Sequence, residues 1–103
     1  MESFALTEAV YYILLSLASP LHGYGIMQRT EQLSRGRVHL APGTLYGALA
    51  ALTERGWIAS QGENGRRKAY RLTESGRAAL CAEVARLREL LENGEAVTGG
   101  WET

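Results

Sequence analysis

The residues whose types and spacing could carry chemistry are concentrated between residues 37 and 72 of this 103-residue chain. Ala41-Pro42-Gly43-Thr44 predicts the start of a helix, because proline suits the first helical turn, where its missing N–H is no loss. Gly56 suits the left-handed position that ends a helix. The free N–H groups at such a helix start, those of Gly43 and Thr44 after Pro42, suit a phosphate.

The helix predicted from residue 42 to residue 55 has two different faces. Leu45, Leu49 and Leu52 form an apolar stripe for the core. The remaining residues are small, polar or aromatic and carry no charge before Glu54: Thr44, Tyr46, Gly47, Ala50 and Thr53. A slim, uncharged helical face can enter the major groove of DNA, about 12 Å wide, without repelling phosphates. Hydroxyls such as those of Thr44 and Tyr46 can contact base edges or phosphates.

A β-hairpin is predicted directly after this helix. Residues 57–61 and 68–72 read as its strands, and Asn64-Gly65 supplies turn residues that tolerate positive φ. Three cations lie beside the tip: Arg66, Arg67 and Lys68. Such a trio can bind backbone phosphates or reach the minor groove, and it can also be an ordinary solvated edge that blunts strand pairing. Its place after the neutral helix favours contact with DNA.

The net charge of zero conceals an uneven distribution. Residues 29–68 hold seven Lys or Arg against three Glu, a net charge of +4, whereas residues 1–28 and 69–103 each have a net charge of −2. The basic third is the third that holds the predicted helix and hairpin, as expected for a protein that binds nucleic acid.

The elements that must position these residues come before and after them. A helix over about residues 7–18, with Thr7 as N-cap, places Leu6, Val10, Ile13, Leu14, Leu17 and Leu21 on one face. A second helix is predicted over residues 23–34, and alternation over residues 37–40 predicts a very short strand. The order of helix, helix, helix and hairpin predicts a mainly α fold with a small β-hairpin, the winged helix-turn-helix.

A last helix is predicted over residues 74–92, with Thr73 as N-cap and Asn93-Gly94 as its end. Its apolar residues are spaced as a short heptad seam: Leu80, Val84, Leu87 and Leu91. The seam could pack on its own domain, but so small a core favours a second copy as its partner. We therefore expect a DNA-binding domain over residues 1–72, a dimerisation helix over residues 73–94 and a flexible tail over residues 95–103.

Other function classes receive little support. No Ser, His and acid set and no carboxylate pair predicts an enzyme, so no catalytic residues and no cofactor are expected. His22, His39 and Cys81 lack metal-ligand spacing. No apolar run is long enough to span a bilayer, and the single Cys81 fits a reducing cytoplasm.

Three motifs together resemble the PadR family of bacterial transcriptional regulators. They are Leu21-His22-Gly23-Tyr24-Gly25-Ile26, Pro42-Gly43-Thr44-Leu45-Tyr46 with Gly56-Trp57-Ile58, and Tyr70-Arg71-Leu72-Thr73-Glu74-Ser75-Gly76. The resemblance spans about residues 4–92. It implies a winged-helix repressor that dimerises through its C-terminal helix, binds a roughly palindromic operator and, in many members, responds to a small aromatic ligand.

The resemblance also implies places for single residues. Thr44 and Tyr46 would lie on the recognition helix, Tyr24 near the start of the preceding helix, and residues 66–68 on the wing. The last helix lacks the Trp that forms an aromatic drug-stacking site in some short members.

Alternatives remain open at this stage. Tyr46 could pack or contact DNA, and packing on its helix is favoured for Tyr24. Trp57 is expected to pack the hairpin, whereas Trp101 lies in the predicted tail or folds over the dimer interface. A winged-helix module for protein–protein contact is the second function class, and a sensor with a ligand cavity between the C-terminal helices is a third.

Overall fold

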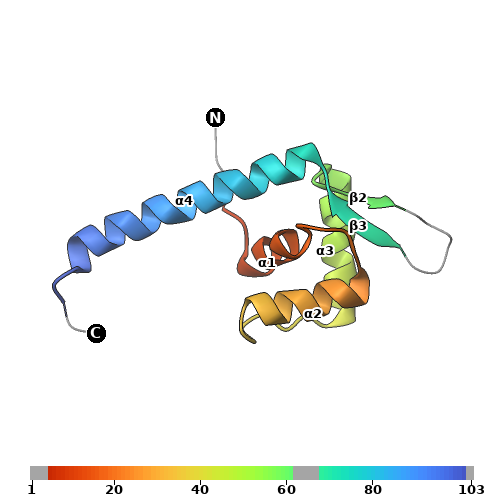
Figure 1. Ribbon diagram of the computed structural model, residues 1–103, viewed down its shortest axis with the longest axis horizontal. Coiled ribbons are helices and arrows are strands. Elements are labelled where there is room, and N and C mark those ends of the chain that lie inside the picture. The colour runs from red at the N-terminus through yellow and green to blue at the C-terminus, as the bar shows by residue number, and fades with distance from the viewer. Residues whose placement is uncertain (1–4, 62–67, 102–103) are drawn as a thin grey trace.

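The computed structural model describes residues 5–61 and 68–101, and Figure 1 shows their arrangement. The described elements, in order, are α1 (Glu8–Ser16), β1 (Leu21–His22), α2 (Gly23–Leu33), α3 (Pro42–Arg55), β2 (Ile58–Gln61), β3 (Ala69–Leu72) and α4 (Glu74–Thr98). The predicted fold class is confirmed: three helices precede a β-hairpin, and a long helix follows it.

The sheet has one strand more than predicted. It is antiparallel with the order β1-β3-β2, and Leu21 of β1 pairs with Tyr70 of β3. The short strand predicted over residues 37–40 is wrong. Those residues are irregular, and Val38 is buried there while its N–H donates to Ser34 Oγ at 2.9 Å. The Val38 N–H thus bonds to a side-chain oxygen and not, as the alternation of apolar and polar residues had suggested, to a neighbouring strand.

The core lies where the predicted apolar stripes meet. Leu45, Leu49 and Leu52 of α3 are buried, as are Ile13 and Leu14 of α1. The other buried apolar residues of this cluster are Leu17, Ile26, Ile58 and Tyr70. Two predictions from periodicity, the stripe of the first helix and that of the third, are therefore confirmed.

The predicted helix caps are present. Thr7 accepts a hydrogen bond from the N–H of Val10 at 3.1 Å, and Thr73 accepts one from the N–H of Gly76 at 3.0 Å. Gly56 has φ of +84°, the left-handed conformation that ends α3. These caps fix where each helix begins or ends.

The predicted end of the last helix is wrong. α4 continues through Asn93-Gly94 to Thr98, whose hydroxyl donates to the carbonyl of Gly94 at 3.0 Å. An Asn-Gly pair ends a helix when the glycine turns left-handed, and Gly94 instead remains helical. Figure 1 shows the far half of α4 extending away from the other helices.

A buried carboxylate attaches α4 to the start of the chain. Glu83 is only 5% exposed, and its carboxylate accepts hydrogen bonds from Arg86 at 2.8 and 2.6 Å. It also accepts one from the N–H of Leu6 at 3.4 Å. The first half of α4 is thereby fixed against the segment that leads into α1.

Candidate nucleic-acid interface

Helix α3 turns the face predicted for DNA contact outward. Thr44, Tyr46, Ala50 and Thr53 are exposed, while the leucines of the opposite face lie in the core. A Cβ added to Gly43 or Gly47 would meet no atom within 4 Å apart from the helix itself. The face is therefore slim and uncharged before Glu54, as the sequence predicted.

Tyr46 both packs and faces solvent. Its hydroxyl end covers Gly23, the first residue of α2, so closely that a Cβ on Gly23 would be 2.2 Å from the Tyr46 oxygen. The residue nevertheless remains 50% exposed. Both alternatives from the sequence are therefore compatible with this position: the ring links α3 to α2 and still presents a surface beside Thr44.

A groove of about 350 Å³ separates α3 from the sheet. Its walls come from α3 and from both strands of the hairpin: Tyr46, Leu49, Ala50, Thr53, Glu54, Ser60, Lys68 and Tyr70. Burial, and secondarily the nearby Tyr46, raises the pKa of the Tyr70 hydroxyl above 10, so this group is a neutral hydrogen-bonding group. The groove brings one cation, Lys68, to the side of the neutral helical face.

The predicted cationic trio is described only in part. Lys68 is exposed directly before β3 and lines the groove. Arg66 and Arg67 lie outside the described residues. The expected contact between the wing and DNA therefore stays a prediction.

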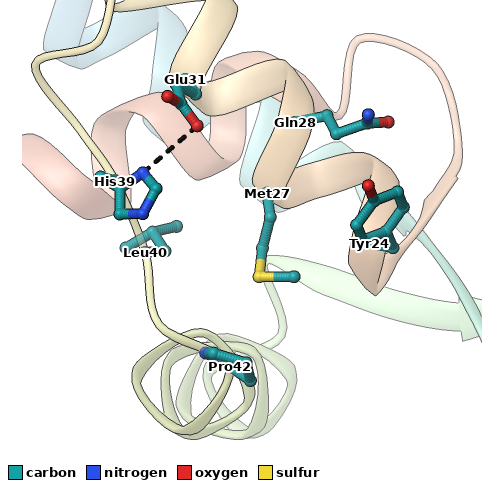
Figure 2. A pocket seen from close by; sticks show the side chains of 7 residues that line it. All are labelled: Tyr24, Met27, Gln28, Glu31, His39, Leu40 and Pro42. Carbon is teal, nitrogen blue, oxygen red and sulfur yellow. Dashed lines mark hydrogen bonds and ion pairs between the residues drawn. The ribbon is translucent and has the colours of Figure 1, made fainter.

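Tyr24 and Pro42 lie at a second hollow, between α2 and the segment that leads into α3 (Figure 2). Tyr24 is 67% exposed, so most of its side chain faces solvent. Figure 2 shows its ring on the flank of α2 beside Gln28. Pro42 is exposed as well, at the start of α3.

The predicted heptad seam divides into two parts. Leu80 and Val84 are half-buried, and Leu80 packs against the core of its own domain. Leu87 is 36% exposed, and Leu91 is 59% exposed. Leu90, Val97 and Trp101 continue this exposed apolar surface along and beyond α4. The domain-packing alternative thus applies to the first half of the seam only.

One arginine of the basic third has a partner within the domain. Arg37 forms an ion pair with Glu8, with hydrogen bonds of 2.5 and 3.1 Å. These bonds lower the pKa of the Glu8 carboxyl and raise that of Arg37. Arg37 therefore connects the loop before α3 to α1 through Glu8.

Sequence reasoning missed three features of this region. They are the β1 strand, the place of Ser60 in the groove, and the close approach of Tyr46 to Gly23. The glycine at the start of α2 was a signal for the last, because glycine often marks a close approach between segments. No group of metal-ligating side chains occurs within residues 5–61 and 68–101.

Comparison with known proteins decides the family. The model of the transcriptional regulator PadR-like family matches residues 12–82. The chain belongs to the PadR-like family. Membership of this family of transcriptional regulators confirms the resemblance seen in the sequence.

Several PadR-like and related proteins are similar to the chain. It is 39% identical over 77 residues to the transcriptional regulator Rv3488 of Mycobacterium tuberculosis, covering 69% of this chain and 72% of that protein. It is 40% identical over 84 residues to an uncharacterized 37.1 kDa protein in transposon TN4556 of Streptomyces fradiae. That match covers 81% of this chain but only 24% of the relative, so the chain spans about a quarter of its length.

A solved PadR-like structure has the same fold. The PadR-like transcription factor from Bacteroides fragilis superposes with a TM-score of 0.72 at 29% identity, over 85% of this chain and 87% of that one. Within the described part of this PadR-like chain, no helix has both the length and the apolar character needed to cross a membrane.

Proposed function

We propose that this PadR-like regulator is a repressor that binds a roughly palindromic operator as a homodimer. The observation that supports the proposal most is the outward, neutral face of α3 with Lys68 beside it across the groove. A neutral helix approaches base edges, and a neighbouring cation binds the adjacent phosphate. Neither role requires a cofactor.

Reading of the operator is assigned to the start of α3. Thr44 and Tyr46 offer hydroxyls to base edges or phosphates. The free N–H groups of the first turn, after Pro42 and around Gly43, favour a phosphate oxygen. Tyr24 lines a hollow together with Pro42, and we assign it to the DNA backbone beside the start of α3.

The wing is assigned to the phosphate backbone or the minor groove. Arg66, Arg67 and Lys68 would release counterions from DNA, so affinity would fall with added salt. Ser60 extends this polar edge along the groove between α3 and the sheet.

The homodimer is assigned to the exposed part of α4. The seam begins with Leu80 and Val84, which are half-buried in their own domain. It continues with three leucines that are exposed in the single chain: Leu87, Leu90 and Leu91. An amphipathic helix with such a stripe is stabilised by a second copy. Two copies related by a two-fold axis would place their α3 helices in half-sites about 34 Å apart.

A repressor of this kind would act in the cytoplasm, where the single Cys81 stays reduced. A small aromatic effector would fit a cavity formed between the two α4 helices of the dimer. The effector site thus requires the dimer and is tested together with it.

Selection of bound fragments from random duplex DNA, at about 50 and 200 mM salt, tests the proposal. We expect enriched sequences with two inverted half-sites about 10 base pairs apart and weaker recovery at the higher salt. Enrichment of no sequence would contradict specific DNA binding and favour a winged-helix module for protein–protein contact. Enrichment of a single half-site would contradict the homodimer.

A further inference from the structure

A second hollow, which we call the α2 pocket, lies between α2 and the segment that leads into α3 (Figure 2). It has a volume of about 390 Å³ and is lined by Tyr24, Met27, Gln28, Glu31, His39, Leu40 and Pro42. That volume falls within the range of small-molecule sites in proteins. The α2 pocket is separate from the groove beside Lys68 and from the apolar surface of α4.

The lower part of the α2 pocket is apolar. Figure 2 shows the Met27 side chain pointing from α2 toward Pro42, with Leu40 on the opposite wall. Met27 and Leu40 are half-buried and pack against the core. Tyr24 adds an exposed aromatic ring at the rim. A flexible methionine beside an aromatic ring can adapt to apolar ligands of different shapes.

The polar part of the α2 pocket carries a negative charge. Glu31 is the acidic residue among those that line it, and neither Lys nor Arg is among them. Glu31 Oε1 lies 3.2 Å from His39 Nδ1, and Figure 2 shows the Glu31 carboxylate pointing toward the His39 ring. Among the described ion pairs, none joins Glu31 to Lys or Arg.

We propose that the α2 pocket binds a small organic cation with an apolar body. The apolar body would lie on Met27 and Leu40, and the positive charge would lie between the Glu31 carboxylate and the face of Tyr24. A carboxylate attracts a cation and repels an anion of the same shape, and an aromatic face adds a cation–π contact. Charge complementarity thus selects the ligand class.

Binding in the α2 pocket would also oppose binding to DNA, an inference that rests on the proposed function. Tyr24 and Pro42 belong both to the rim of the pocket and to the residues assigned to DNA contact. A ligand on that rim would occupy the space of the DNA backbone. The positive charge of the ligand would not offset this exclusion, because the backbone contact assigned to Tyr24 needs the same side chain.

Two ions of closely matched shape and opposite charge provide the test. Tetraphenylphosphonium and tetraphenylborate are titrated by calorimetry into the full chain without DNA. We expect saturable binding of one tetraphenylphosphonium per chain and about fivefold weaker binding by Glu31→Gln, as for a partly exposed charge contact. Glu92→Gln removes a carboxylate from the exposed surface of α4 and should bind as the wild type does.

Tyr24→Leu provides a second variant, because it keeps an apolar side chain but removes the aromatic face. We expect it to weaken tetraphenylphosphonium binding about threefold. Equal binding of tetraphenylborate, or unchanged affinity in both Glu31→Gln and Tyr24→Leu, would overturn the proposal. A loss of affinity in Glu92→Gln alone would overturn it too, because the cation would then lie on α4.

The titration is then repeated with the selected DNA duplex bound to the protein. Release of DNA by tetraphenylphosphonium in the wild type, and reduced release in Glu31→Gln, would support the opposition between the two ligands. Binding of the cation without release of DNA would overturn only that opposition. Failure of the protein to bind any duplex would instead contradict the proposed function. It would leave the cation site standing, because the first titration contains no DNA.

Discussion

The hydroxyl end of Tyr46 lies against the backbone of Gly23, where a Cβ would be 2.2 Å from the tyrosine oxygen and 2.8 Å from Cζ. The ring of an α3 residue is thus supported by the first residue of α2. The missing side chain of Gly23 sets how close the two helices of the helix-turn-helix can come at this point.

Replacing Gly23 by Ala is expected to displace the Tyr46 ring while the domain stays folded. The obstructing atoms belong to the end of a side chain that can rotate, so the free energy of unfolding should change by about 1 kcal/mol or less. Operator affinity, measured by fluorescence anisotropy, should fall about tenfold, because a hydroxyl assigned to DNA moves.

Gly25→Ala is the matched control for Gly23→Ala. A Cβ on Gly25 would lie 3.4 Å from the nearest atom of Leu21, an ordinary contact distance. This variant should bind DNA as the wild type does. Equal affinity of both variants and the wild type would contradict the proposed role of Tyr46.

A second glycine faces the backbone and allows no such adjustment. A Cβ on Gly76, in the first turn of α4, would be 1.9 Å from the carbonyl oxygen of Trp57. That carbonyl also accepts a hydrogen bond from the N–H of Thr73 at 3.0 Å, which fixes its position. Gly76→Ala should therefore destabilise the protein by about 2 kcal/mol, measured by urea unfolding. A midpoint equal to that of Gly23→Ala would contradict this account.

Helix α3 was predicted well because its signals are local. Pro42 at the start, the leucine spacing and Gly56 at the end each act within one helix, and each is present in the structure. The relation between Tyr46 and Gly23 is different, because it depends on how two helices cross. Periodicity assigns a residue to a face, but it does not say which atom of another helix lies opposite.

The errors in the sequence reading have the same origin. The two residues of β1 are too few to show alternation, and they pair only because β3 lies beside them. Asn93-Gly94 predicted the end of the last helix, but Gly94 keeps a helical conformation and α4 continues past it. The burial of Glu83 had no signal in the sequence, since its partner Leu6 is 77 residues away.

The two faces of the proposed DNA interface should respond differently to mutation. Lys68→Ala is expected to weaken binding to all duplexes alike and to lower the slope of affinity against salt by about one unit. Thr44→Ala should change the preferred sequence more than the slope. Filter binding to specific and non-specific duplexes over a range of salt concentrations checks both. A further variant replaces three residues by Ala: Arg66, Arg67 and Lys68. If its slope of affinity against salt equals that of the wild type, the wing does not contact DNA.

The exposed leucines of α4 should hold the proposed dimer together. Replacing Leu87 and Leu91 by Glu is expected to give a monomer in sedimentation equilibrium, because like charges would replace an apolar contact. The monomer should stay folded, since both leucines are exposed in the single chain. Ala85→Glu, a change at another exposed position of α4, should leave the mass unchanged. A dimer in both variants would place the interface elsewhere.

The carboxylate of Glu83 should make stability depend on pH. Hydrogen bonds from Arg86, and to a lesser degree from the N–H of Leu6, lower its pKa below 4.5, although burial acts in the opposite direction. A carboxyl whose pKa is lower in the folded state stabilises that state above its unfolded pKa. This stability is lost as the pH falls below about 4.5 and through the lowered pKa.

Glu83→Gln should therefore lower the free energy of unfolding at about pH 7 by about 1–2 kcal/mol, because it leaves Arg86 without its charged partner. The difference from the wild type should shrink at about pH 3.5, below the ordinary pKa of 4.5, because the unfolded wild type then binds a proton that the folded state binds less readily. Urea unfolding at both pH values measures this, with Glu89→Gln, an exposed carboxylate of the same helix, as control. Glu8 contributes pH dependence in the same direction in every variant, since its pKa is also lowered. An equal deficit of Glu83→Gln at both pH values would mean that lost packing, and not lost charge, causes its effect.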